Sequence, residues 1–319
     1  MGSGAQSLKR EYYDALRQLT LDLSGIQLGR DHSFLIETRL AGLARTEGFP
    51  SLADMIEELF ATGHNRLAVR VVSALLERDA RFFADLASVG VFAKTVLPRL
   101  MKVENMNAGD MNAGERRPRV LVFGCGSGQD VWTLAMMARQ FAHAQGRAQG
   151  AESGAGGPVI DIVGADYPSA SLERARAGVY THFEVQRGLP TAQLVRHFTP
   201  VQQDQGGNQG DWRVGERLRE GVAFEGVHLL GKLDALGTFD AVVFRGALGR
   251  YSGSARVRVL RGVVGALRDG GMLLLGSDEV LESAWTLGAV EGARGLYVKA
   301  APEVVEVAEV KRTRFGAAG

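Results

Sequence analysis

The architecture of this chain is predicted from the segment Arg119-Val-Leu-Val-Phe-Gly-Cys-Gly-Ser-Gly-Gln-Asp-Val-Trp-Thr-Leu-Ala-Met-Met137. Its short apolar run predicts a buried strand, and the helical spacing that resumes after the glycines predicts a helix. Gly124, Gly126 and Gly128 permit a sharp turn between the two and let a ligand approach the main chain. Strand, glycine turn and helix together predict the start of an α/β nucleotide-binding unit.

A second strand supports this interpretation. Val159-Ile-Asp-Ile-Val-Gly-Ala-Asp166 is apolar and ends in an acid that is placed to receive the two ribose hydroxyls of a nucleoside. The G-x-G-x-G spacing is one residue tighter than that of dinucleotide binders, and S-adenosylmethionine (SAM) methyltransferases commonly carry it. The alternatives are a plain strand-to-helix turn at the glycines and a helix N-cap at Asp166.

Composition narrows the functional classes. The chain has 319 residues, a net charge of +1, 45% hydrophobic residues and a single cysteine, Cys125. No apolar run approaches the roughly 18 residues of a membrane span, and the N-terminus has no signal-peptide pattern. One cysteine fits a reducing compartment, so a cytoplasmic location without direct membrane insertion is expected. The balanced charge does not indicate nucleic acid as a partner, and the scattered histidines predict no metal site.

The organisation predicted from these patterns is an α/β fold in two domains. Helical spacing at about 8–23, 31–47, 51–60 and 65–77 predicts a small N-terminal all-α domain over residues 1–102, and residues 103–117 are expected to be a linker. Alternating strand and helix patterns over 118–301 predict a Rossmann-like, mostly parallel sheet with an antiparallel edge. A small β-subdomain is expected at about 200–226, and residues 302–319 are expected to form a tail.

The residues resemble one family over about residues 10 to 300: the CheR chemoreceptor glutamate O-methyltransferases of bacterial chemotaxis. Six modest motifs occur in the family's order. They are Phe82-Phe83 with Val96-Leu-Pro98, Gly124 to Met137, Asp166 with Leu172-Glu-Arg-Ala-Arg-Ala-Gly-Val-Tyr180, Phe224 to Leu230, Phe239 to Tyr251, and Leu267 to Gly276.

This resemblance implies a SAM-dependent methyltransferase that esterifies glutamates on chemoreceptor cytoplasmic helices, or on another signalling protein, and releases S-adenosylhomocysteine. It implies catalytic roles for Arg250 and Tyr251 and substrate-binding roles for Arg39, Arg45 and Arg81. The implied cofactor-binding residues are Gly124, Cys125, Gly126, Gly128, Gln129, Asp166, His228, Leu229, Arg245 and Gly246.

Several positions depart from the family's motifs. Ala84 stands where the family has an arginine, Gly246 where it has an asparagine, and Arg250 where it has a tyrosine; Gln129-Asp130 and His228 replace two glutamates and an asparagine. We therefore predict reduced or altered activity. The alternatives are a catalytically degenerate module that binds SAM or its product as a regulatory or scaffold protein, and a small-molecule methyltransferase on the same fold.

Overall fold

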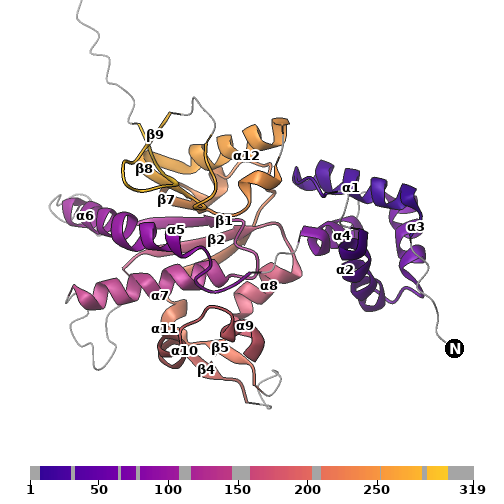
Figure 1. The fold of residues 1–319 in the computed structure, drawn as a ribbon, viewed down its shortest axis with the longest axis horizontal. Coiled ribbons are helices and arrows are strands. Elements are labelled where there is room, and N and C mark those ends of the chain that lie inside the picture. The colour runs from indigo at the N-terminus through magenta and orange to yellow at the C-terminus, as the bar shows by residue number, and fades with distance from the viewer. Residues whose placement is uncertain are drawn as a thin grey trace, which may run out of the picture.

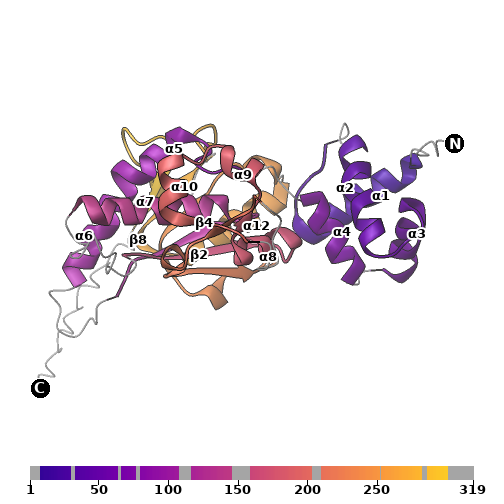
Figure 2. The same cartoon turned by 90° about the horizontal axis from the view of Figure 1, so that it is seen from below.

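Four helices form a lobe at one end of the molecule (Figures 1 and 2): α1 (Arg10–Ser24), α2 (Ser33–Thr46), α3 (Leu52–Thr62) and α4 (Arg66–Leu76). The computed structural model describes residues 8–29, 33–63, 66–76, 80–107, 116–145, 159–202, 210–251, 253–281 and 286–300. Gly25, in the left-handed conformation at φ 73°, ends α1, and the Ser51 side chain accepts a hydrogen bond from Asp54 N to begin α3. The predicted helices are therefore present, with small shifts at their ends.

A seven-stranded sheet forms the centre of the molecule, in the order β6-β2-β1-β7-β8-β10-β9. Five strands run parallel: β1 (Arg119–Phe123), β2 (Asp161–Asp166), β6 (Val222–Gly226), β7 (Phe239–Phe244) and β8 (Leu267–Leu275). β10 (Leu296–Lys299) and β9 (Leu287–Ala289) complete it as an antiparallel edge. The sheet confirms the predicted α/β class.

Helices cover both faces of this sheet because alternate side chains of each strand point to opposite sides. Val120 and Val122 of β1 pack in one core with α6 (Leu97–Asn107) and α7 (Gln129–Ala144), while Leu121 and Phe123 pack in the other with α12 (Gly253–Ala266). The short helix α5 (Leu86–Val91) and a π-helical turn at Phe92–Val96 lead into α6. The core beside α12 continues into α1–α4, so the lobe is packed onto the sheet domain.

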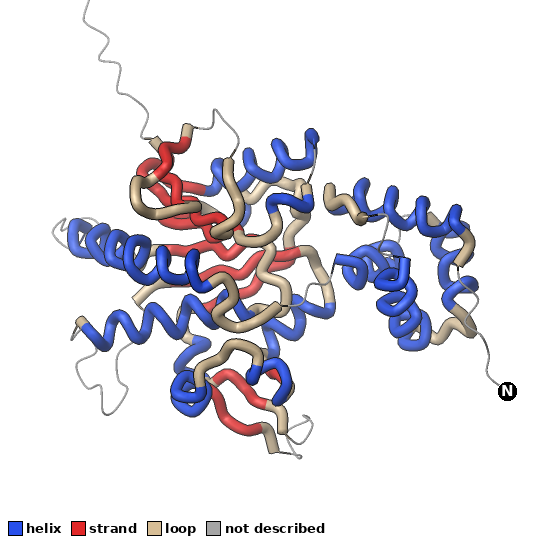
Figure 3. Tube along the Cα trace, in the orientation of Figure 1, coloured by secondary structure: helices blue, strands red, loops and turns tan. Residues whose placement is uncertain are grey.

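A smaller sheet lies below the main one in Figure 3, built from β3 (Val179–Tyr180), β5 (Trp212–Val214) and β4 (Phe198–Pro200). Around it lie α8 (Ala170–Ala177), α9 (His182–Gln186), α10 (Thr191–His197) and α11 (Glu216–Arg219). This differs from the predicted subdomain at about 200–226, because β6 pairs with β2 in the main sheet and β3 joins the small one. Helix α6 also runs through Asn107, into the segment predicted as a linker.

An arginine cluster secures the amino end of β7. The buried carboxylate of Asp240 accepts bonds from Arg116 to both oxygens at 2.9 Å, from Arg268 at 2.9 Å and from Arg119 N at 2.8 Å. Burial alone would raise the pKa of Asp240, but the hydrogen bonds from Arg116 and Arg119 N and the charges of Arg268 and Arg116 outweigh it and hold this pKa below its ordinary value. Ion pairs therefore hold the amino end of β7, whereas the candidate site lies at the carboxyl end.

No helix in the described ranges combines the length and apolar character that crossing a bilayer requires. Nor do those ranges bring three His, Cys, Asp or Glu side chains close enough together to hold a metal ion.

Candidate functional site

The strand order reverses between β1 and β7. From β1 the chain proceeds outward through β2 to β6 and then returns to the other side of β1 as β7. In open α/β sheets such a switch point leaves a crevice at the carboxyl ends of the two strands, where ligands bind. The glycine turn follows β1 and Arg245-Gly246 follow β7, so both predicted motifs lie at this crevice.

Asp166 and the glycine turn are joined by short hydrogen bonds. Gly126 N donates to Asp166 Oδ2 at 2.5 Å, and Tyr167 N donates to Oδ1 at 2.6 Å. A carboxylate offers about four lone-pair positions, so these two bonds do not by themselves exhaust its capacity to accept a ligand's hydroxyls. Gly126 has φ 54°, and a Cβ built on it would meet nothing within 4 Å. The turn therefore presents an open main-chain surface beside the acid.

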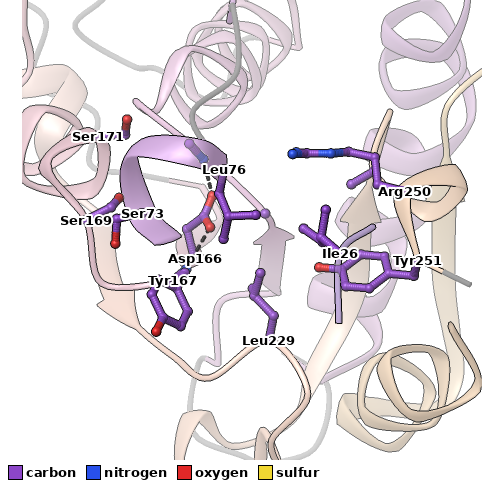
Figure 4. Close-up of a pocket in the computed structure, with 13 residues that line it drawn as sticks. Ile26, Ser73, Leu76, Asp166, Tyr167, Ser169, Ser171, Leu229, Arg250 and Tyr251 are labelled. Atoms are coloured by element: carbon purple, nitrogen blue, oxygen red, sulfur yellow. Dashed lines mark hydrogen bonds between the residues drawn. The ribbon is translucent and has the colours of Figure 1, made fainter. Parts of the chain in front are cut away.

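A hollow opens between this turn and the helical lobe (Figure 4). Asp166 and Tyr167 lie on one side of it, and Arg250 and Tyr251 lie on the other. The lobe is held over the hollow by Ser73 Oγ, which donates to Pro168 O at 2.8 Å, and by a β-bridge between Ile26 and Tyr251. The lining residues are Ile26, Ser73, Leu76, Gly124, Gly126, Asp166, Tyr167, Ser169, Ser171, Leu229, Ala247, Arg250 and Tyr251.

The chemistry of this lining fits the nucleoside half of SAM. Tyr167 and Leu229, 6% and 4% exposed, offer apolar walls for a flat ring, and Asp166 is a charged acceptor at its edge. Burial raises the pKa of the Tyr167 hydroxyl, so this side chain is neutral at physiological pH. A solvent-accessible carboxylate beside apolar side chains suits an adenosine, because the carboxylate can accept from the ribose hydroxyls and the apolar side chains can contact the base.

The predicted site residues fall into three groups. Six line the hollow just described: Gly124, Gly126, Asp166, Leu229, Arg250 and Tyr251. Four line a second hollow that also adjoins the glycine turn: Arg81, Cys125, Arg245 and Gly246. Five line neither: Arg39, Arg45, Gly128, Gln129 and His228.

The third group has other surroundings. A Cβ on Gly128 would lie 2.9 Å from the Ala175 Cβ, so this glycine permits close packing of α7 on α8. Gln129 is 1% exposed, and its Oε1 accepts from Ser127 Oγ at 2.8 Å. His228 is exposed, with its ring edge-on to Tyr167. Gly128 and Gln129 therefore have packing contacts within the protein, and their contact with the cofactor stays a prediction.

The basic residues also differ in position. Arg39 is half-buried, and its Nη1 donates to Leu75 O at 2.8 Å, which ties α2 to α4. This differs from the outward orientation expected for a substrate-binding arginine, whereas Arg45 is exposed on α2. Arg245 is buried and forms an ion pair with Asp130 at 2.5 Å, so it is held within the protein at the crevice.

Two sets of residues at the site have no signal in the sequence. Ile26, Ser73 and Leu76 wall the hollow from the helical lobe, which only tertiary packing brings there. The carboxylate of Glu279 accepts hydrogen bonds from Gly246 N and Gly276 N at 2.9 Å and from Leu248 N at 2.8 Å. It therefore joins the loops that follow β7 and β8.

Comparison with known proteins supplies the family. The sequence model described as "CheR methyltransferase, SAM binding domain" matches residues 78–292. The Pseudomonas aeruginosa protein named chemotaxis protein methyltransferase 1 is 30% identical over 259 residues, which cover 81% of this chain and 86% of that protein. Chemotaxis protein methyltransferase Cher2 of Pseudomonas putida is 28% identical with the same coverage, and a Vibrio parahaemolyticus chemotaxis protein methyltransferase is 28% identical over 85% of this chain and 90% of its own length. This chain therefore belongs to the CheR family of SAM-dependent methyltransferases.

Proposed function

We propose that this chain transfers the methyl group of SAM to glutamate carboxylates on the cytoplasmic helices of chemoreceptors, with lower turnover than a typical member of its family. The observation that carries the proposal is the position of Arg250. Its side chain lines the nucleoside hollow and also an adjoining hollow, open to solvent, whose other walls include Gly246, Arg256 and Glu279. A cation between a cofactor site and an open hollow is suited to receive an acidic side chain from another protein.

The chemistry needs no acid or base from the protein. SAM supplies an electrophilic methyl carbon on a sulfonium. Glutamate titrates near pH 4.3, so its carboxylate is already ionised at neutral pH. One carboxylate oxygen forms a bond to the methyl carbon, the carbon–sulfur bond breaks, and its electron pair stays on sulfur. No proton moves, so the protein contributes by alignment and by exclusion of water.

Arg250 and Arg256 are the cations best placed to orient the incoming carboxylate. Arg256 donates from Nη2 to Val280 O at 3.5 Å, which keeps it at the wall of the open hollow. A bidentate guanidinium pair aligns a carboxylate, yet it also stabilises the charge that must attack the methyl carbon. A guanidinium at position 250 is therefore expected to give slower methyl transfer than a neutral hydrogen-bond donor would allow.

A second candidate is a regulatory or scaffold module that binds SAM or S-adenosylhomocysteine without transferring a methyl group. The identities of Ala84 and Gly246 favour it, because both line the second hollow and neither has a side chain that can hydrogen-bond a ligand. The ion pair between Arg245 and Asp130 likewise uses two charges of that hollow internally.

The two candidates differ in one product. Purified protein incubated with methyl-labelled SAM and receptor-containing membranes is expected to place label on receptor protein, and mild base is expected to release it as methanol, as it does from a carboxyl ester. Binding of SAM without base-labile label on any membrane protein would favour the module. Label on small molecules of the membrane preparation, not released by mild base, would instead indicate a small-molecule methyltransferase.

A further inference from the structure

The second hollow adjoins the glycine turn. Its lining includes Cys125, Gly246 and Gly276, which follow β1, β7 and β8. Its cavity volume of about 260 Å³ is ample for an amino-acid head group. Cys125 lies between Gly124 and Gly126 in the sequence, so the two hollows meet at the glycine turn.

Five charged side chains line this hollow, and three of them are engaged within the protein. Arg245 pairs with Asp130 at 2.5 Å and donates to Ala84 O at 3.0 Å. The two oxygens of Asp85 accept from Ser88 N at 3.3 Å and Ser277 N at 2.8 Å. Within the part of the chain that the structure describes, the other two, Arg81 and Asp278, have no such internal bond.

These two charges suit the head group of SAM. The methionine end of SAM carries a carboxylate and an ammonium on one carbon atom, so it requires a cation and an anion that face the same space. A guanidinium recognises a carboxylate through two parallel hydrogen bonds, and a carboxylate accepts from an ammonium. We propose that Arg81 binds the carboxylate and Asp278 the ammonium of the methionine moiety of SAM. The proposal rests on the proposed function only as far as SAM binding.

The backbone that carries Arg81 is fixed in position. Phe83 and Asp85 both have φ 50°, a left-handed backbone conformation that residues other than glycine rarely adopt. It is maintained by Phe83 N, which donates to Thr133 Oγ1 at 3.1 Å, and by the bond from Arg245 to Ala84 O. Strained backbone of this kind is found where a fixed geometry serves a site. The exposed Arg81 side chain therefore lies two residues before a backbone segment that these hydrogen bonds hold in place.

A truncated ligand separates this contact from the nucleoside contacts. 5′-Methylthioadenosine has the adenosine and thioether of SAM but no amino-acid head. In calorimetric titrations, Arg81→Gln is expected to weaken SAM binding about 10- to 100-fold, the loss typical of a charge-assisted pair, and to change methylthioadenosine binding less than twofold. Asp278→Asn is expected to weaken SAM binding about 3- to 10-fold. Arg99→Gln, which removes an equally exposed arginine near the opposite end of the sheet, is the matched control and is expected to change neither affinity.

Each contrary result has a distinct meaning. Equal SAM affinity in wild type and Arg81→Gln overturns the assignment, and so does an equal loss for both ligands, which would indicate a disturbed glycine turn. Wild-type protein that binds methylthioadenosine as tightly as SAM also overturns it, while SAM binding itself stands. Wild-type protein that binds neither ligand refutes the proposed function together with this inference.

Discussion

Replacement of Asp166 by alanine is expected to weaken SAM binding without unfolding the protein. The carboxylate lies beside the glycine turn, lines the hollow, and accepts from Gly126 N at 2.5 Å and Tyr167 N at 2.6 Å. Hydrogen bonds to a charged group contribute about 1.5 to 3 kcal/mol each, and the mutant can recover part of this through water. The expected loss is about 1 to 3 kcal/mol, which is roughly 5- to 150-fold in affinity.

Isothermal titration calorimetry measures this loss, and a thermal melt of each variant reports on the fold. Asp161→Ala is the matched control, because Asp161 lies at the other end of β2 and pairs with the half-exposed Arg117. It is expected to leave SAM affinity unchanged. If Asp166→Ala keeps both its melting temperature and its wild-type affinity for SAM, Asp166 does not hold the ribose and the interpretation of the hollow is wrong.

Three further outcomes are expected. The triple variant Ala84→Arg, Gly246→Asn, Arg250→Tyr should raise the methyl-transfer rate at least tenfold, because φ 60° at Gly246 also suits asparagine and each restored contact contributes about 1 to 3 kcal/mol; no gain over an already efficient wild type would show that these positions are rewired. Arg45→Glu should lower receptor methylation and leave SAM affinity intact, as measured by initial rates at two salt concentrations. Asp240→Ala should lower the free energy of unfolding, measured in urea, by about 2 kcal/mol, less than the loss of a fully buried pair because the arginine partners are about one-third exposed. The pKa of Asp240 is lowered in the folded protein, so its contribution to stability is complete above the unfolded value of 3.8 and declines as pH falls below that value. The variant should therefore lose less stability than the wild type in acid.

The part of the site formed by local pattern could be predicted from the sequence. A glycine turn between an apolar strand and a helix has few conformations, and an acid at the end of the adjacent parallel strand must lie beside it. Gly126 and Asp166 are within hydrogen-bond distance for this reason. The class of fold followed from the same alternation of strands and helices.

The remaining features depend on packing between distant segments. Ile26 and Leu76 form a wall of the hollow only because the helical lobe docks onto the sheet, and Glu279 bonds to Gly246 N across 33 positions of sequence. The short strands at Trp212 and Val222 both fall within the predicted β-subdomain but lie in different sheets, because their partners, not their own residues, decide the pairing. No local pattern distinguishes these cases.

The internal ion pair of Arg245 illustrates the same limit at the level of one side chain. A motif places this arginine next to the crevice, but its orientation depends on Asp130, 115 positions earlier in the chain. Its buried position and its bonds to Ser88 Oγ and Ala84 O give it a role in holding α5 and the residues just before it against the end of β7. Motif position alone did not reveal that role.

Mass-spectrometric mapping of receptor protein, after incubation with the purified chain and SAM, measures glutamate methylation directly. We expect methyl esters on glutamates of the receptor's cytoplasmic helices, formed by wild-type protein, lost in Asp166→Ala and inhibited by S-adenosylhomocysteine. Receptor that carries no methyl ester, although calorimetry shows wild-type protein saturated with SAM, would contradict the claim that this chain is a protein-glutamate methyltransferase.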